Sequence, residues 1–465
     1  MVVFAKRTTC AAIAVTSFLI CLNVVHAQNK KLYSLAELVD STKHYFPSLL
    51  QKEALANSAK AGITEARHAY LPKLSISDEA VTASANSLPG SYFPIGTIPS
   101  VSGSINAQNN STAASGNIAS LYAEYELVNF GLRGAKTKNA EAFAGLQQAD
   151  FDKELYVVKW QIGRLYFDLL KNKYQLAIDE QNIKRNEFIY SVITALTSSG
   201  INAGVDSLIA KAELSKTKIG YNNREGEIER LHEQLAFYTG IEAGIDIDTT
   251  QKKYANSNAL LPVSIDTFHN PLIEYYSKQE SLFKSAETLA RKMYLPKVML
   301  AGGGWGRGSS IDYTGQYKNF SNGFGYQRFS YGIAIGVTYD LLNGIRKHDR
   351  LSVSRLQTTA VGFEAQQQKN ALKLGSAQAD IAIKLAEKNL AELPTQLQAA
   401  SGAFDQKVAQ YKAGLINLID LTNASFVLYT TQSAYVQTQN DWLLANLNKA
   451  ATAGQLDSFI QSIKQ

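Results

Sequence analysis

The chain has 465 residues, of which 45% are hydrophobic and 18% charged, and its formal net charge is +6 at pH 7. Lys6 and Arg7 precede a short apolar run, so residues 1–27 are predicted to be a secretory signal peptide, with a retained anchor as the weaker alternative. Without those two charges the net charge falls to +4, too weak a bias to indicate a nucleic-acid partner. Both cysteines, Cys10 and Cys21, lie in this segment, which excludes disulfides and thiol chemistry from the mature chain. No later segment approaches about 18 consecutive apolar residues, so no transmembrane helix is expected.

An eight-residue motif occurs twice, 224 residues apart. Residues 66–73 read A-R-H-A-Y-L-P-K, and residues 290–297 read A-R-K-M-Y-L-P-K. In each copy a helix-compatible run precedes the motif and an alternating, strand-like run follows it. Proline lacks an N–H and excludes the residue before it from the α region, so each helix is predicted to end at that preceding residue. Pro72 and Pro296 are therefore predicted to be helix-to-strand joints in two tandem copies of one unit.

The first copy is predicted over residues 28–240. Two short helical segments come first, followed by strands at about 72–82 and 118–129. The stretch between the strands is rich in Ser, Asn, Gly and Pro, which is typical of an exposed loop. Residues 132–240 are predicted to form a long helical hairpin.

The second copy repeats this order of elements after a connector at residues 241–269, which has no clear period. Its predicted parts are the repeat 270–450, with strands at about 296–306 and 330–342 and a helical hairpin at 345–450, and then a C-terminal tail, 451–465.

Residues 331–341 give the clearest strand pattern in the chain. The odd positions are apolar or aromatic, and the even positions are small or polar. Tyr331 and Tyr339 lie eight steps apart, roughly 26 Å at about 3.3 Å per residue, which is close to the height of a membrane apolar band once the strand is tilted. This pattern predicts one face on lipid, with both tyrosines in a lipid-facing aromatic girdle. A strand of a soluble sandwich is the alternative.

Each hairpin is predicted to contain a long helix with apolar residues every seventh position. The 68 residues from 132 to 199 hold no proline and would make a rod of roughly 100 Å. The repeated positions are Leu155, Ile162, Leu169, Leu176, Ile183 and Tyr190, then Ile383, Leu390, Leu397, Phe404 and Tyr411. A sustained heptad indicates helices that coil around one another. Pro394 is predicted to interrupt and kink the second helix.

Both hairpins turn at a G-x5-D sequence. The first runs from Gly200 to Asp206 and the second from Gly414 to Asp420. Glycine permits the left-handed conformation that ends a helix, and the aspartate could then cap the next one.

This order of elements, with its Y-L-P-K joints and G-x5-D turns, resembles the TolC-like outer-membrane efflux protein family over nearly the whole mature chain. The resemblance implies a mainly α fold with a small transmembrane β part, built from a duplicated α-β-β-α-α unit. It implies a homotrimer in the outer membrane of a Gram-negative bacterium, in which each chain gives four strands to a shared β-barrel and long coiled-coil helices to an α-barrel tunnel in the periplasm. The expected partners are a periplasmic adaptor and an inner-membrane transporter, in a tripartite efflux or type I secretion system.

The resemblance also assigns roles to the turns. Gly200 and Gly414 become the adaptor-contact tips. The expected tunnel-entrance and gate residues are Asp206, Tyr411, Asp420 and Asn423. Asn423 stands where better-known members carry a second ring aspartate, and Ile416 stands where they carry a gate arginine. A ring of carboxylates at an entrance favours cations. Simple helix capping is the alternative role for both aspartates.

Physical reasoning supports oligomerisation independently of the resemblance. Four strands cannot close into a barrel, and open sheet edges do not survive in hydrocarbon. A chain with four membrane-spanning strands must therefore share its barrel with other copies.

The main hypothesis for the function is a passive exit duct with no enzyme activity, cofactor or metal. A soluble periplasmic coiled-coil binding or adaptor protein is the alternative. An exported hydrolase is disfavoured, because His232-Glu233 lacks the second histidine of a metal-binding pair and no nucleophile–base set stands out. The substrate cannot be read from the sequence.

Overall fold

The computed structural model describes residues 32–84, 86, 107–199, 203–242, 245–247, 270–312 and 314–464. The predicted signal peptide, most of the predicted connector and the predicted tip glycine Gly200 lie outside these residues.

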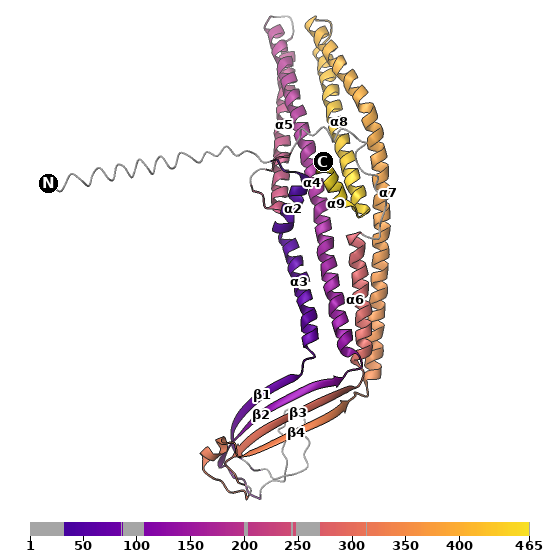
Figure 1. The fold of residues 1–465 in the computed structure, drawn as a ribbon. Helices are drawn as coiled ribbons and strands as arrows, with labels where there is room; N and C mark the ends of the chain where they lie inside the picture. The colour runs from indigo at the N-terminus through magenta and orange to yellow at the C-terminus, as the bar shows by residue number, and fades with distance from the viewer. Residues whose placement is uncertain are drawn as a thin grey trace, which may run out of the picture. The chain divides into compact units, whose positions relative to one another are not determined.

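The described chain is mainly helical and contains one sheet (Figure 1). In the first half the elements are α2 (Leu35–Tyr45), α3 (Pro47–His68), β1 (Lys73–Ser84), β2 (Ala113–Val128), α4 (Leu132–Ser198) and α5 (Gly204–Thr239). In the second half they are α6 (Pro271–Met293), β3 (Lys297–Ser309), η3 (Phe320–Phe324), β4 (Arg328–Thr338), α7 (Asn343–Lys412), α8 (Leu418–Thr452) and α9 (Leu456–Lys464). The predicted fold class, a duplicated order of helix, two strands and two long helices, is confirmed.

The chain divides into two compact units, and each contains segments from both sequence repeats. The helical unit comprises the described residues of Met1–Glu53, Phe151–Glu274 and Gln367–Gln465. The sheet unit comprises those of Ala54–Asp150 and Tyr275–Gln366. The duplication in sequence therefore does not correspond to one compact unit per repeat.

The heptad positions of α4 and α7 face the cores of the helical unit. Ile162 and Leu169 are fully buried, and Phe404 and Tyr411 lie in a second buried cluster with Leu418. Apolar side chains that repeat at this spacing lie on one face of a helix, so neighbouring helices bury them together. The seven-residue repeat is thus a packing pattern completed within one chain.

One expectation about the helices is wrong. Helix α7 runs without a break from Asn343 to Lys412 with Pro394 inside it, because proline removes one helical hydrogen bond while neighbours such as the buried Leu393 remain packed. The C-terminal tail, for which the sequence supported no structural expectation, contains α9, an amphipathic helix whose Leu456, Phe459 and Ile460 join the core. No helix of the described residues is long and apolar enough to cross a membrane.

The sheet unit holds four antiparallel strands in the order β1-β2-β3-β4. Strand β2 begins at Ala113 rather than near 118, because its first residues pair with the last ones of β1. Strand β4 ends at Thr338 rather than near 342, where the Asp340 carboxylate accepts the Leu342 N–H at 2.9 Å and turns the chain into α7.

The two joints have the same construction. Pro72 and Pro296 directly precede β1 and β3. The helices end at His68 and Met293, earlier than the residue before each proline, so that expectation is wrong by two or three residues. The residue before a proline is excluded from the α region, and the final turn therefore loosens into three-residue hydrogen bonds, such as the 2.9 Å bond from the Leu71 N–H to the His68 carbonyl.

Candidate functional site

The register of the sheet separates its side chains into two faces of different chemistry. Residues directly opposite each other in an antiparallel pair point to the same face. The outer face carries Leu74, Ile76, Asp78, Ala119, Leu121, Ala123, Val298, Leu300, Phe329, Tyr331, Ile333, Ile335 and Val337. The inner face carries Lys73, Ser75, Ser77, Glu79, Val81, Ile118, Ser120, Tyr122, Glu124, Met299, Ala301, Trp305, Arg307, Ser330, Gly332, Ala334 and Thr338. The outer face is therefore mainly apolar, whereas the inner face is mixed and holds most of the polar and charged side chains of the sheet.

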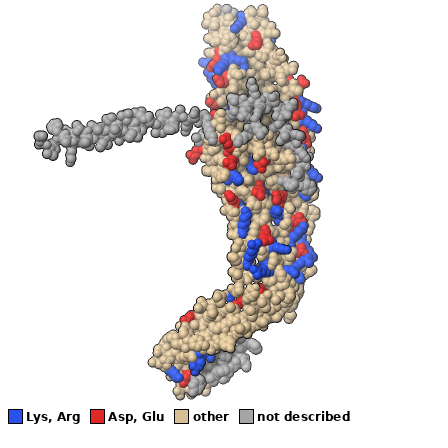
Figure 2. Space-filling view, viewed as in Figure 1, with Lys and Arg blue, Asp and Glu red and all other residues tan. Residues whose placement is uncertain are grey.

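The outer face is exposed in spite of its apolar character. Ile76 is 84% exposed, Tyr331 87% and Ile333 80%. Figure 2 shows the strand surface that faces the viewer to be almost free of charged residues, whereas Lys, Arg, Asp and Glu are scattered over the helices. A continuous apolar face of this kind indicates a membrane or a protein partner. Its one carboxylate among the paired strand residues, Asp78, accepts a 2.8 Å hydrogen bond from the Tyr326 hydroxyl.

The two girdle tyrosines lie at different places. Tyr331 lies on the outer face of β4, while Tyr339 follows the last residue of the strand and is 50% exposed. Phe329, 80% exposed, is a further aromatic on the outer face near the Tyr331 end. The sequence pattern treated residues 331–341 as one strand, and so it missed Phe329.

The turn between α7 and α8 is held by its own backbone. Gly414 has φ of +70°, in the left-handed region. Its N–H donates to the Tyr411 carbonyl at 3.0 Å, and the Leu415 N–H donates to the Gln410 carbonyl at 3.0 Å. This pair of bonds is a Schellman motif, which satisfies the last carbonyls of α7 and favours glycine at this position.

Neither predicted aspartate caps its helix, so the capping interpretation is wrong. Asn417 precedes α8, and its side chain accepts the Asp420 N–H at 2.9 Å. Helix α5 begins at Gly204 after Ala203, which makes no side-chain cap. Asp206 and Asp420 both lie in the first turns of their helices, where a negative charge is favoured by the helix dipole. The Asp420 carboxylate is exposed, and Asp206 is half-buried.

The remaining predicted gate residues lie in contrasting surroundings. Tyr411 is 4% exposed and packs in the buried cluster with Phe404, Leu418 and Leu421. Asn423 is exposed and lies one helical turn after Asp420 on α8. Asp420 and Asn423 thus share one surface of α8, whereas the ring of Tyr411 belongs to the core.

Several solved structures share this fold. CusC, in a study of its folding and transmembrane channel formation, matches with a TM-score of 0.76 at 13% identity, over 90% of this chain and 92% of that one. The outer membrane protein VceC from Vibrio cholerae matches with a TM-score of 0.71 at 14% identity, over 90% and 96% of the two chains. The open state of the MtrE outer membrane channel from Neisseria gonorrhoeae matches with a TM-score of 0.68 at 18% identity, over 90% and 89%.

The family model described as outer membrane efflux protein matches residues 38–241. Over these residues the chain is similar to the outer membrane efflux protein family. No curated protein sequence matches the chain significantly. The family model and the structural matches agree with the predicted family, function and location, those of an outer-membrane efflux channel, and the soluble periplasmic alternative is not favoured. The family is one of channels and not a class of enzymes.

The chain also exposes apolar side chains near the starts of α5 and α8, which sequence reasoning missed. Val205 and Leu208 on α5, and Leu415 and Ile419 around the start of α8, are each more than half exposed. Their signal in the sequence is apolar character at positions outside the heptad. Exposed apolar residues near the ends of the long helices are suited to contact with another protein.

A buried polar network joins three helices in the helical unit. The Asp179 side chain on α4 is 4% exposed, and it accepts hydrogen bonds from the Tyr429 hydroxyl and the Gln175 amide, each at 2.9 Å. Arg224 on α5 is ion-paired with Asp179 at 3.4 Å and donates to Asn172 at 2.7 Å. Burial, followed by the hydrogen bond to Asp179, raises the pKa of Tyr429. The network therefore fixes the register of α4, α5 and α8.

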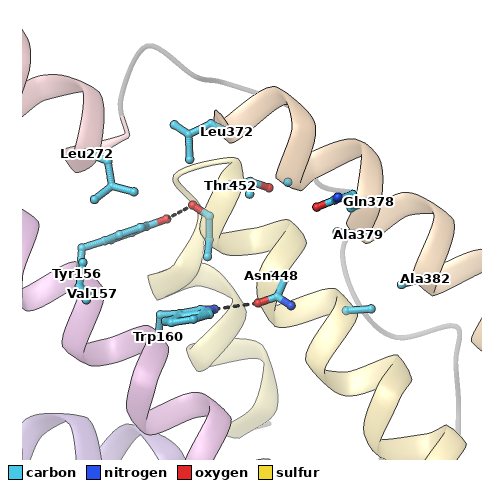
Figure 3. Close-up of a pocket in the computed structure, with 13 residues that line it drawn as sticks. Tyr156, Val157, Trp160, Leu272, Leu372, Gln378, Ala379, Ala382, Asn448 and Thr452 are labelled. Carbon is cyan, nitrogen blue, oxygen red and sulfur yellow. Dashed lines mark hydrogen bonds between the residues drawn. The ribbon is translucent and has the colours of Figure 1, made fainter. Parts of the chain in front are cut away.

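An apolar cavity of about 540 Å³ lies in the helical unit, between α4, α6, α7 and α8 (Figure 3). Two aromatic residues of α4 form one wall. The Tyr156 hydroxyl donates to the Ala451 carbonyl at 2.6 Å, and the Trp160 indole N–H donates to Asn448 at 2.8 Å. Burial raises the pKa of Tyr156. Because their polar groups bond to α8, these aromatics tie α4 to α8. Among the described residues no group of three or more His, Cys, Asp or Glu side chains is arranged to hold a metal ion.

Proposed function

We propose that this outer-membrane efflux channel is the exit duct of a tripartite efflux or type I secretion system and conducts cargo passively outward. The observation that carries the proposal is the two-faced sheet. Its outer face is mainly apolar and exposed, and its inner face is mixed and holds most of the polar and charged side chains. That combination is suited to strands with lipid on one side and a watery lumen on the other.

Several copies are needed to complete such a duct. The strand order leaves β1 and β4 as the edges of the sheet. Unpaired edges are too costly in hydrocarbon, so each edge pairs with a strand of another copy. Three copies, with twelve strands in total, agree with the family resemblance.

The helices support the same assembly. Leu374, Ile381 and Leu385 on α7 are each more than half exposed at seven- and four-residue spacing. An apolar stripe of this period is suited to a neighbouring helix, and in the proposed trimer that helix belongs to the next copy.

The helical turns form the periplasmic entrance in this proposal. Copies of Asp420, exposed in the first turn of α8, ring the opening and attract cations. Asp206 and Asn423 lie at the same entrance, and Tyr411 supports the turn from the core. Gly200 and Gly414 mark the tips. The exposed apolar residues beside the turns, such as Leu208 and Leu415, contact a periplasmic adaptor, which in turn binds an inner-membrane transporter.

Two experiments test the proposal. On cell fractionation the mature protein is expected in the outer membrane and extractable only with detergent; recovery in the soluble periplasmic pool would reject the duct. In planar bilayers the purified protein is expected to conduct ions with a preference for cations.

Asp420→Ala is expected to lower the cation-to-anion permeability ratio severalfold, because it removes one negative charge per copy. Asn423→Ala, one turn away, removes no charge and serves as the matched control. Equal cation selectivity in the two variants would show that Asp420 is not part of the charged entrance.

A further inference from the structure

The inner face of the sheet carries two aromatic side chains that a merely polar duct wall does not require. Trp305 on β3 stands opposite Ser120 and Ser330, and Tyr122 on β2 stands opposite Gly303. Trp305 is 38% exposed and Tyr122 is 40% exposed. They are diagonal neighbours across β2 and β3, at a separation of roughly 7–8 Å that aromatic side chains can span.

A pair of glycines forms a floor beside these rings. Gly303 and Gly332 stand opposite each other on β3 and β4. A Cβ added at Gly332 would lie 3.9 Å from two carbons of the Trp305 ring, so the indole reaches over this glycine. A Cβ added at Gly303 would lie 2.7 Å from the Leu121 carbonyl oxygen, so the close approach of β2 requires glycine there.

The rings and the glycines border an open hollow of about 450 Å³. We call it the aromatic hollow. The inner-face side chains that line it are Ile118, Ser120, Tyr122, Ala301, Trp305 and Ala334. None of the residues that line it is charged. The volume lies within the range of small-molecule sites, roughly 300–1,000 Å³.

We propose that the aromatic hollow is a weak binding station for neutral, planar aromatic cargo, an inference that rests on the proposed duct because only there does the inner face line a lumen. A flat ring stacks against Trp305 or meets its edge, in the arrangements that aromatic pairs prefer. An uncharged lining offers nothing to offset the desolvation of an ion, which selects against charged molecules. Weak binding suits a conduit, since cargo must leave as readily as it enters.

The test uses the full mature protein in lipid nanodiscs and quinoxaline, a neutral two-ring aromatic. Binding is followed by saturation-transfer NMR, with empty nanodiscs to correct for partition into lipid. Trp305→Ala is expected to weaken binding by about three- to tenfold, because it removes one aromatic contact. Trp305→Phe, which keeps a ring, is expected to retain part of the affinity.

Two glycines of β4 provide a matched pair. Both lie on the inner face, but Gly332 forms the floor of the hollow, while Gly336 lies outside its lining and has open space around it. Gly332→Val fills the floor and is expected to weaken quinoxaline binding by about as much as Trp305→Ala. Gly336→Val adds the same side chain beyond the hollow and is expected to leave the affinity unchanged.

Unaltered quinoxaline binding in both Trp305→Ala and Gly332→Val would overturn the inference. The absence of saturable binding to the unaltered protein would also overturn it, and that result is expected if a neighbouring copy fills the hollow. Ion conductance of the same preparations in planar bilayers tests the duct separately. If the protein conducts ions but does not bind quinoxaline, the proposed binding site is rejected and the duct is retained. If it binds quinoxaline but does not conduct ions, the duct is rejected.

Discussion

In the helical unit Ile162 and Leu169 are fully buried, whereas in the sheet unit Ile333 and Ile335 are 80% and 68% exposed. The residue types are alike, and both sets recur at the period of their element. The difference is that the helical unit completes its core within one chain, while among the described residues no layer of the same chain covers the outer face of the sheet. Apolar side chains left in that position need lipid, so the comparison separates a self-sufficient fold from one that the membrane completes.

The largest expected effect on stability comes from replacing one isoleucine by alanine in each unit. Ile162→Ala removes a fully buried side chain and is expected to cost about 2–5 kcal/mol in the free energy of unfolding, because a cavity remains. Ile333→Ala is expected to cost less than about 2 kcal/mol, since lipid chains fill the space. Denaturant unfolding of the two variants in lipid nanodiscs measures both. Equal costs would mean that the outer face is covered by protein.

A charge on the outer face tests the same comparison within one strand. Ile335→Arg places a cation on lipid and is expected to cost about 2–4 kcal/mol of membrane stability near the bilayer centre. Gly336→Arg places the same side chain on the inner face, where nothing lies within 4 Å of the added Cβ, and is expected to be tolerated. The amount of each variant in the outer-membrane fraction measures the difference. Similar loss in both variants would contradict the assignment of faces.

The smallest expected effect lies at two glycines of the helical unit. Gly414 has φ of +70°, so Gly414→Ala is expected to destabilise the protein by about 1 kcal/mol, although open space surrounds it. Gly402 lies inside α7, also in open space, so Gly402→Ala is expected to stabilise by about 0.5–1 kcal/mol. Thermal unfolding should show shifts of opposite sign. Shifts of the same sign would mean that the strained turn does not form.

Sequence alone predicted the order of elements, because proline joints, heptads and glycine turns are local signals. Strand ends were less predictable: Ala113 extends β2 only because Ser84 lies opposite it, and that pairing is not local. The roles of Asp206 and Asp420 as caps were wrong, since Asn417 has the same chemistry and lies closer to the helix start.

Features that depend on three-dimensional proximity could not be predicted. The Asp179 network joins residues on α4, α5 and α8 that are far apart in the chain. The aromatic hollow depends on the register that sets Trp305 beside Gly332. Pro394 predicted an interruption of α7, because the loss of a helical hydrogen bond at proline can be read from the sequence. The packing that keeps α7 continuous cannot be read from the sequence.

The central claim is that strands β1 and β4, the edges of this sheet, pair with each other between copies. The test combines Ser77→Cys on β1 in turn with Ser330→Cys, Gly332→Cys, Ala334→Cys or Gly336→Cys on β4. Each pair places both thiols on the inner face of the sheet. The predicted mature chain contains no other cysteine. Pairs of Ser77 with Ile333 or Ile335 place the thiols on opposite faces and serve as controls. Oxidation in intact cells is expected to give, for at least one inner-face pair, a covalent ladder that stops at three chains, with none in the controls. A protein that stays a single chain in every variant would contradict the account.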